Sequence, residues 1–400
     1  MSRAYLNRRT EPHITTLVIA TATGPLALNI FLPALPAMAR HFDTSYGKVQ
    51  LALSLYLAAM AALQLLVGPA SDRFGRRPVM LGSFSIFVAA TIGAILAPTL
   101  EVLLVCRVLQ AFAVAGMALA RAIVRDTVAP DLAASRLGYI TMGMGVVPMV
   151  APAIGGILDE NFGWQSTFIA NCGYGLFALL VVFLDLGETN RAPSSSLTAQ
   201  FRAYPSLLRS RMFWAYSLTA AFTSGSFFAF LGGAPYISSE MLGMSPSTYG
   251  LYFTLMALGY MCGNFLSGRF SARLGINRMT LVGSAVTLFG VALTWILFWF
   301  EQLHPLSLFG PMALAGLGNG IALPSTNVGI VSVKPSLAGS ASGLGGALQI
   351  GAGAVLSFLA GLHLTPESGP WPLLSLLVFA AVAALAANLW VIALSRDDAK

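Results

Sequence analysis

The sequence is poor in charge: only 9% of its 400 residues are Asp, Glu, Lys or Arg, whereas soluble proteins carry about 25%. A soluble fold of this size could not cover its surface with so few charges. Intrinsic disorder is also excluded, because 56% of the residues are hydrophobic and disorder requires low hydrophobicity. The composition and the mean hydropathy of +0.77 therefore predict an all-α, polytopic membrane protein.

Groups for catalysis and metal binding are equally scarce. The three cysteines, Cys106, Cys172 and Cys262, are far apart and form no CxxC pair or Cys/His ligand spacing. The sequence has no GxxxxGK[ST] phosphate-binding loop and no carboxylate or Ser/His/Asp set arranged for catalysis. We therefore expect no enzyme activity, no metal site and no cofactor.

Long apolar runs are what the sequence has in abundance. A helix needs about 20 apolar residues to cross a bilayer, and cutting the chain at charged and turn-forming clusters gives twelve such runs. The first is too long for a cleaved signal peptide. The predicted spans are 15–37, 48–70, 79–97, 101–122, 136–158, 166–186, 212–236, 246–268, 279–300, 305–332, 338–362 and 372–394.

The basic residues are distributed unevenly about these spans. Twelve spans place both termini on one side, and Lys and Arg accumulate on the cytoplasmic side. Of the 22 basic residues, eighteen fall in the termini and in the loops after even-numbered spans. The sequence therefore predicts a multi-pass membrane protein with both termini in the cytoplasm. The net charge of +7 is then an orientation signal, and nucleic acid is excluded as a partner.

The longest polar stretch separates two halves of six spans each. We expect an N-terminal bundle at 1–186, a cytoplasmic central loop at 187–211 and a C-terminal bundle at 212–400. Within the loop, Pro193–Ser196 is typical of a linker, and Ala199–Leu208 predicts a short interfacial helix.

A loop motif recurs at an offset of 200 residues. Gly68, Ser71, Arg73 and Gly75 after span two correspond to Gly268, Ser271, Arg273 and Gly275 after span eight. Both loops follow the second span of a half, which indicates a parallel duplication about an axis along the membrane normal.

This motif has a physical use beyond its charge. Gly68 permits close helix approach, Gly75 permits a left-handed turn, and Asp72 can pair with neighbouring arginines. We predict that the two loops act as a conformational latch. The alternative is a turn whose positive charge only sets the orientation of the protein in the membrane. The latch residues are Gly68, Asp72, Arg73, Gly75, Arg76, Arg77, Arg273 and Gly275.

Two six-helix halves with the motif Gly68–Pro78 resemble the major facilitator superfamily over essentially the whole chain. Further motifs resemble the Bcr/CflA and chloramphenicol/florfenicol exporters within it. They are Phe31–Pro36, Leu53–Tyr56 with Gln64, Arg107–Gln110, Arg121–Asp126, Pro148–Gly156, Gly163–Gln165 and Ala338–Ser342 with Gln349. The resemblance implies the twelve-helix fold of that superfamily and the activity of a drug:proton antiporter.

Span five contains Pro148, Pro152, Gly155 and Gly156, which thin and kink one helix face. In the resembling exporters this pattern is the antiporter motif, although Ala151 stands where they usually have glycine. The alternative interpretation is a packing kink without a role in antiport.

Polar and aromatic residues inside the spans are candidates for substrate contact, because each polar group must be satisfied there. Arg107 lies about six residues, or roughly 9 Å, inside span four. The alternatives are interhelical hydrogen bonding, aromatic packing and, for Arg107, snorkelling to the interface. The candidate substrate-binding residues are Asn29, Tyr56, Arg107, Gln110, Thr223, Phe227, Phe230, Asn319 and Gln349.

The sequence departs from the resembling exporters at one informative position. Their motif has an aspartate, the usual proton carrier, where this chain reads Leu28-Asn29-Ile30. An amide does not titrate. The resemblance therefore supports drug export more strongly than it supports proton coupling by the usual route.

Together with the resemblance, these observations predict a monomeric secondary transporter of the bacterial inner membrane. It is expected to export small amphipathic drugs or toxic metabolites, in antiport with protons, by alternating access of its two halves. The expected partners are the substrate, protons and the lipid bilayer. The alternatives are an uncoupled or differently coupled metabolite carrier of the same fold and, outside transport, a membrane enzyme or receptor.

Overall fold

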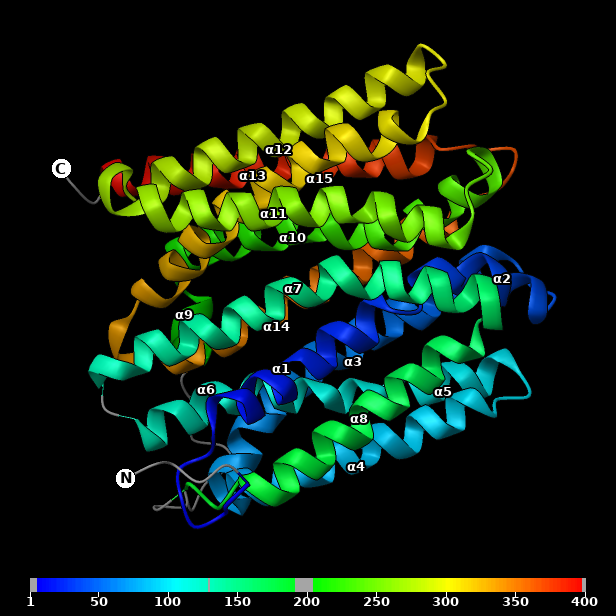
Figure 1. The fold of residues 1–400 in the computed structure, drawn as a ribbon. Helices are drawn as coiled ribbons and strands as arrows, with labels where there is room; N and C mark the ends of the chain where they lie inside the picture. Colours follow the sequence, from blue (N-terminus) through cyan, green and yellow to red (C-terminus); the bar gives the residue numbers. More distant parts are fainter. Residues whose placement is uncertain (1–5, 129, 191–203, 398–400) are drawn as a thin grey trace.

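The protein is described here by a computed structural model that covers residues 6–128, 130–190 and 204–397. Within these ranges the secondary structure is helical throughout (Figure 1). The helices before the central loop are α1 (Ile14–Asn29), α2 (Leu35–His41), α3 (Tyr46–Phe74), α4 (Arg76–Ile95), α5 (Leu100–Gln110), α6 (Val114–Thr127), α7 (Pro130–Phe162) and α8 (Gln165–Asp185). After it follow α9 (Tyr204–Leu208), α10 (Arg211–Tyr236), α11 (Pro246–Leu274), α12 (Ile276–Trp299), α13 (Pro305–Ser332), α14 (Ala338–Leu362) and α15 (Trp371–Asp397).

The described residues contain twelve helical rods of membrane-spanning length, as the sequence predicts. Ten are long and apolar enough to cross a bilayer, counting α1 with α2 and α5 with α6 as continuous rods. The other two, α10 and α11, have 26 and 29 residues and run alongside them (Figure 1). Many large side chains such as Phe265 and Phe289 are exposed on the outside, which suits contact with lipid tails.

The predicted spans differ from the helices mainly at charged ends. We predicted that the second span ends at residue 70 and the eighth at residue 268, but α3 continues to Phe74 and α11 to Leu274. We ended each of these predicted spans before the first charged residue, which was too early. Charged residues in the last turn of a helix lie at the membrane surface and do not end the helix. Each loop of the repeat is therefore reduced to one turn residue, Gly75 or Gly275.

The central segment is described only in part. The linker predicted at Pro193–Ser196 lies outside the described residues. The interfacial helix predicted at Ala199–Leu208 is represented by the five-residue α9 (Tyr204–Leu208), and its earlier residues lie outside the described ranges.

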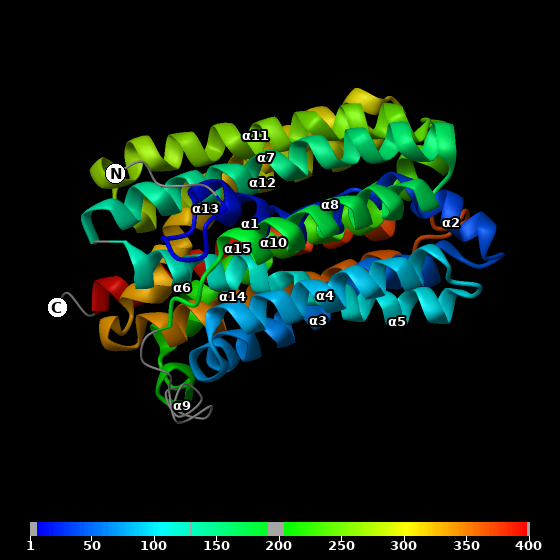
Figure 2. The same cartoon turned by 60° about the horizontal axis from the view of Figure 1, so that its bottom comes forward.

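The long helices run roughly parallel, so the molecule has two ends (Figures 1 and 2). The start of α1 and the end of α15 lie at the same end, which we call the termini side. The helix α2 and the connections from α4 to α5 and from α7 to α8 lie at the opposite end, which we call the far side.

Two helix pairs join the N-terminal group of helices to the C-terminal group: α3 packs on α14, and α7 packs on α11. Glycine makes the second contact possible near the far side. A Cβ on Gly156 would overlap the carbonyl oxygen of Pro246, and one on Gly250 would overlap that of Pro152. A Cβ on Gly155 would likewise overlap the carbonyl oxygen of Ile30, the residue that follows α1. The small residues Gly155 and Gly156 thus allow backbone contact of α7 with α11 and with the residue that follows α1.

Candidate functional site

The far side is closed by hydrogen bonds between the two helix groups. The Tyr46 hydroxyl donates to the Gly232 carbonyl at 2.7 Å. Gln50 Nε2 donates to both the carbonyl and the hydroxyl of Ser357, at 2.7 and 2.6 Å. Gln50 is fully buried, so these bonds are shielded from water. They fix α3 against α10 and α14.

Charged groups at the rim extend this closure. Arg40 pairs with Glu240 at 3.5 Å, and the Glu160 carboxylate accepts from the Ser247 amide at 3.2 Å. Both contacts join the N-terminal to the C-terminal group of helices. The ion pair is half-exposed and adds little stability by itself, so the buried bonds of Gln50 and Tyr46 carry most of the closure.

The termini side is open instead. A cavity of about 540 Å³ lies there between α3 and α6 on one side and α13 and α14 on the other. Its wall combines polar, cationic and apolar side chains. They include Gln64, Ser71, Asp72, Arg76, Met117, Arg121, Arg125, Val331, Ser340 and Ser342. The structure therefore shows a state that is closed at the far side and accessible from the termini side.

Arg107 lies inside the N-terminal group and is fully buried. Its Nε donates to the Ala52 carbonyl at 3.0 Å, and Nη1 donates to the Ala27 carbonyl at 3.2 Å and to Gln110 Oε1 at 2.7 Å. Gln110 in turn donates to the Thr91 hydroxyl at 2.9 Å. The side chain thus ties α5 to α1, α3 and α4, and it does not snorkel to the interface.

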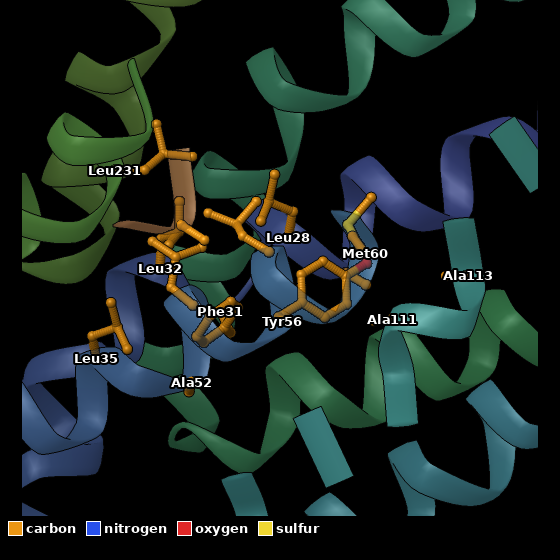
Figure 3. Close-up of a cluster of buried hydrophobic side chains, with 14 of the residues drawn as sticks. Leu28, Phe31, Leu32, Leu35, Ala52, Tyr56, Met60, Ala111, Ala113 and Leu231 are labelled. Carbon is orange, nitrogen blue, oxygen red and sulfur yellow. The ribbon is translucent and has the colours of Figure 1, made fainter. Parts of the chain in front are cut away.

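Two aromatic rings cover the guanidinium. Its carbon lies 4.1 Å from the ring centroid of Phe31 and 4.3 Å from that of Tyr56, which is cation–π geometry. Figure 3 shows Phe31 and Tyr56 beside Leu28, with Leu231 of α10 approaching from the other helix group. The Tyr56 hydroxyl donates to the Gly24 carbonyl at 3.1 Å. Tyr56, Arg107 and Gln110, three of the candidate residues, therefore lie together.

The charge of Arg107 is incompletely matched. Among the described residues no carboxylate forms a salt bridge with it, and its Nη2 is buried without a hydrogen-bond partner. A buried charge of this kind is costly unless an acceptor is supplied. The site therefore has a vacant, charge-assisted donor.

Asn29 is also buried, but none of the described hydrogen bonds joins its side chain to Arg107. Its Nδ2 donates to the Pro25 carbonyl at 2.7 Å, and its Oδ1 has no partner. The two residues are linked through α1, whose Ala27 carbonyl accepts from Arg107.

The candidates from the C-terminal group do not converge on one point. Phe230 is fully buried in an aromatic core with Phe253 and Phe309, at centroid distances of 6.4 and 5.9 Å. Asn319 accepts from Thr287 at 3.1 Å between α12 and α13. These two side chains hold helices together and do not face the termini-side cavity.

The remaining candidates are more accessible or less satisfied. Phe227 is half-buried and contacts Phe228 edge-on at 5.6 Å. The Thr223 hydroxyl is buried without a partner, and Gln349 is half-buried on α14.

The latch motif centres on Arg76, whose side chain is only 6% exposed. Its guanidinium pairs with Asp72 of α3 and with Asp126 of α6, the latter at 3.0 Å, and donates to the Ser71 hydroxyl. Gly75 takes a φ of +99°, and a Cβ there would overlap the Glu188 carboxylate. This turn requires glycine both for its backbone conformation and for space.

Sequence reasoning missed part of this cluster. Glu188 accepts from the amides of Arg76 and Arg77, at 2.9 and 3.2 Å, and so caps α4. Arg77 also donates through Nε to the Leu186 carbonyl at 2.8 Å. In the sequence, this role of Glu188 was indicated only by its position just after the sixth predicted span. Arg73, by contrast, is exposed and rests 5.4 Å from the ring of Phe74.

The second copy of the motif has the same turn but different chemistry. Gly275 takes a φ of +79°, yet residues 276 and 277 are Ile and Asn, and Arg273 is exposed without a described ion pair. Asn277 accepts from the Tyr216 hydroxyl at 2.7 Å and donates to Ser395 at 3.2 Å. The first copy is thus ionic, and the second is held by neutral hydrogen bonds.

Comparison with known proteins agrees with this architecture. The profile of the Major Facilitator Superfamily matches residues 17–354. The chain is 33% identical over 356 residues to the uncharacterized MFS-type transporter YdgK of Bacillus subtilis, covering 86% of each protein. It is 31% identical to the multidrug resistance protein D of Escherichia coli, covering 88% of this chain and 89% of that protein. It is 30% identical to a chloramphenicol resistance protein of Pseudomonas aeruginosa, covering 87% and 83%.

Solved structures share the fold at lower identity. A bacterial homologue of the human lysosomal transporter Spinster, inward-facing and occupied, matches with a TM-score of 0.74 and 19% identity over 96% of each chain. The D-xylose–proton symporter matches with a TM-score of 0.73 and 14% identity, over 93% of this chain and 96% of its own. The chain therefore belongs to the major facilitator superfamily: it is a multi-pass membrane transporter and not an enzyme.

Proposed function

We propose that this transporter exports small amphipathic compounds, such as drugs or toxic metabolites, from the cytoplasm. The one-sided accessibility carries the proposal: the far side is closed by buried bonds, while the termini side opens into a cavity of about 540 Å³. The basic loops on the termini side support its placement in the cytoplasm. The names of two relatives, for multidrug and chloramphenicol resistance, support the substrate class and a bacterial inner membrane.

The moving parts in this proposal are the helix groups Ile14–Asp185 and Arg211–Asp397, joined by the segment between them. The bonds of Gln50 and Tyr46 break when the far side opens. Arg76 with Asp72 and Asp126 forms the latch that holds α3, α4 and α6 in one arrangement on the termini side. The tight contact of Gly156 with α11 is the pivot at the far side, and the protein acts as a monomer.

Arg107 sets the substrate preference in this proposal. Its free Nη2 is a charge-assisted donor, and the rings of Phe31 and Tyr56 offer an apolar surface beside it. A neutral or anionic aromatic compound satisfies both features, whereas a cation meets repulsion. Asn29, Gln110, Thr223, Phe227 and Gln349 are the further residues that we assign to the substrate path.

Coupling to protons needs an acid other than residue 29. Of the acids in the membrane-length helices whose side chains the structure describes, Asp159 and Asp185 are buried. Asp185 accepts from the amides of Leu6 and His13 and from the hydroxyl of Thr16, so it is committed to capping α1. Asp159 of α7 is 7% exposed and has Arg40 and Glu160 as charged neighbours. We assign the proton to Asp159.

The test uses the purified protein in proteoliposomes with chloramphenicol as the probe, with and without an imposed pH gradient. Export that is accelerated by the gradient supports a proton antiporter, and the Asp159→Asn variant is then expected to transport without responding to the gradient. Gradient-independent transport by the wild type supports an uncoupled carrier. No transport of chloramphenicol or of other aromatic compounds contradicts the proposed drug export.

A further inference from the structure

Two arginines in the wall of the termini-side cavity have no role in the site described so far. Arg121 and Arg125 of α6 both line this cavity and are exposed to it. Neither forms a salt bridge among the described residues. They lie one helical turn apart, so their Cβ atoms are about 5–6 Å from each other on the same face of the helix. Like charges at this spacing repel, and a bound anion relieves that repulsion.

The position of Arg121 differs from that of an arginine whose charge only orients the protein. It lies six residues before Thr127, the last residue of α6, which is about 9 Å along the helix axis. Arginines that set orientation gather in the loops and at the ends of spans. A guanidinium at this depth is costly unless it faces water, a ligand or an acceptor, and Arg121 faces the cavity.

The third arginine in the cavity wall is already occupied. Arg76 pairs with Asp72 and with Asp126. Asp72 is the only carboxylate among the described residues that line the cavity, and its charge is matched by Arg76. The wall therefore presents Arg121 and Arg125 as two cationic groups with no acid to pair with them.

The opposite wall offers hydroxyl groups and the positive end of a helix. Ser340 and Ser342 line the cavity from the first turns of α14, which begins at Ala338. The first turn of α14 contains no acidic residue, and the described hydrogen bonds include no side-chain cap on it. The helix dipole therefore places partial positive charge at this wall. An anion held by α6 meets hydrogen-bond donors from the other helix group.

The remaining lining determines the size and the body of a matching ligand. The volume of about 540 Å³ is within the range of small-molecule pockets, and Val114, Met117 and Val331 supply apolar surface. Planar guanidinium groups bind carboxylate, sulfonate and phosphate oxygens through paired hydrogen bonds. The ligand that fits this wall is therefore a compact apolar body with one terminal oxyanion.

We propose that Arg121 and Arg125 form a binding site for water-soluble organic oxyanions. The two guanidinium groups of α6 hold the anionic group, and Ser340 and Ser342 of α14 complete the site from the other helix group. The site is separate from Arg107, which is fully buried and is not part of the cavity lining. Binding of the anion does not depend on the proposed function; only its role as a transported substrate rests on that function.

The binding test compares naphthalene-1-sulfonate with naphthalene-1-sulfonamide, which has the same rings but no charge. Isothermal titration of the full chain in an uncharged detergent measures both affinities. The wild type is expected to bind the sulfonate about tenfold more tightly, because charge-assisted hydrogen bonds form only with the anion. Arg121→Gln and Arg125→Gln should each reduce this ratio about tenfold, with the sulfonamide as the internal control for a folded site. Equal affinities in the wild type, or an unchanged ratio in both variants, overturn the site.

Arg269→Gln is the matched control. Arg269 is exposed near the end of α11 on the termini side and lies outside the cavity lining. The variant removes the same charge, so it should keep the wild-type ratio. A loss equal to that of Arg121→Gln would assign the binding to net charge and overturn the site.

Two further measurements exclude other positions and ligands. Arg107→Gln tests the buried arginine: a loss in this variant without a loss in the α6 variants moves the anion to Arg107 and overturns the site. Nanodiscs with and without phosphatidylglycerol test a lipid headgroup. Sulfonate binding that is equal in both supports a soluble ligand, whereas binding that is abolished by phosphatidylglycerol identifies the headgroup and overturns the proposal.

The role of the anion as a substrate is tested by transport in proteoliposomes. In Arg121→Gln, the ratio of kcat/KM for the sulfonate to that for the sulfonamide is expected to fall about tenfold, mainly through a higher KM for the sulfonate. An unchanged ratio, or transport of chloramphenicol without transport of the sulfonate, overturns the substrate role. If the wild type carries none of these probes, the proposed export fails, and the titration still decides whether the cavity binds oxyanions.

Discussion

At the scale of single residues, Arg107 is the side chain whose surroundings best define a function. The Arg107→Ala variant should fold but lose at least tenfold in transport, which corresponds to about 1.4 kcal/mol. Arg107→Lys should recover only part of the rate, since a single ammonium cannot reach the carbonyls of Ala27 and Ala52 in the fork geometry of a guanidinium. Transport rates at matched protein levels check this, with the exposed Arg9→Ala as the control for loss of one charge.

Asn29 allows a test of whether an acid can be restored on α1. In Asn29→Asp, the carboxyl is neutral at low pH, so transport of an anionic probe should resemble that of the wild type. As the pH rises the carboxyl ionises, competes with the anion for Arg107 and slows transport. The measurement is the rate against pH for an anionic and a neutral probe. Identical profiles in both proteins would show that residue 29 does not influence the Arg107 site.

At the scale of helices and turns, the Arg76 cluster predicts unequal roles for the two copies of the repeat. Asp72→Asn removes one partner of Arg76 but leaves Asp126 and Ser71 in place. We expect normal insertion and a transport rate reduced several-fold. Arg273→Ala should have little effect, because Arg273 is exposed and outside any described ion pair. Wild-type transport by Asp72→Asn at equal protein levels would exclude the latch.

The contact between α7 and α11 predicts a different kind of defect. Gly156→Ala places a methyl group against the backbone carbonyl of Pro246, so the helices must separate at the far side. Spin labels at the exposed residues Phe162 and Leu251 should report a longer distance than in the wild type. Gly138→Ala on the same helix is the control, because a Cβ there has open space. An unchanged distance in Gly156→Ala would mean that α11 yields without opening.

At the scale of the whole molecule, the buried bonds of Gln50 predict the balance between conformations. Gln50→Leu keeps the side-chain bulk but removes two bonds to Ser357, each worth about 1 kcal/mol net. The population open at the far side should rise about tenfold or more. Distances between labels at the far side measure this shift in detergent and in nanodiscs. A wild-type distribution in Gln50→Leu would assign the closure to Tyr46 and the rim charges.

The sequence predicted the fold well because bilayer thickness imposes a length and a hydropathy on every span. It also predicted that Asp72 pairs with a neighbouring arginine beside the turn at Gly75. It could not predict that Gln50 meets Ser357, since the two lie 307 positions apart and neither is unusual in its own helix. Phe230 was misleading for a related reason: an aromatic residue facing a helical core and one facing a substrate path share the same spacing.

The repeated turn, ionic in one half and neutral in the other, gives the two halves different sensitivities to salt. Of the ionic cluster, Asp72 is the most exposed, at 44% of its side chain. Dissolved salt therefore weakens its attraction to Arg76 more than it weakens the buried contact of Arg76 with Asp126, and it leaves the hydrogen bonds between Asn277, Tyr216 and Ser395 nearly unchanged. Raising ionic strength should therefore loosen the turn at Gly75 more than the turn at Gly275. The two copies of one motif thus differ in a physical property: the ionic strength on the termini side affects the first turn and not the second.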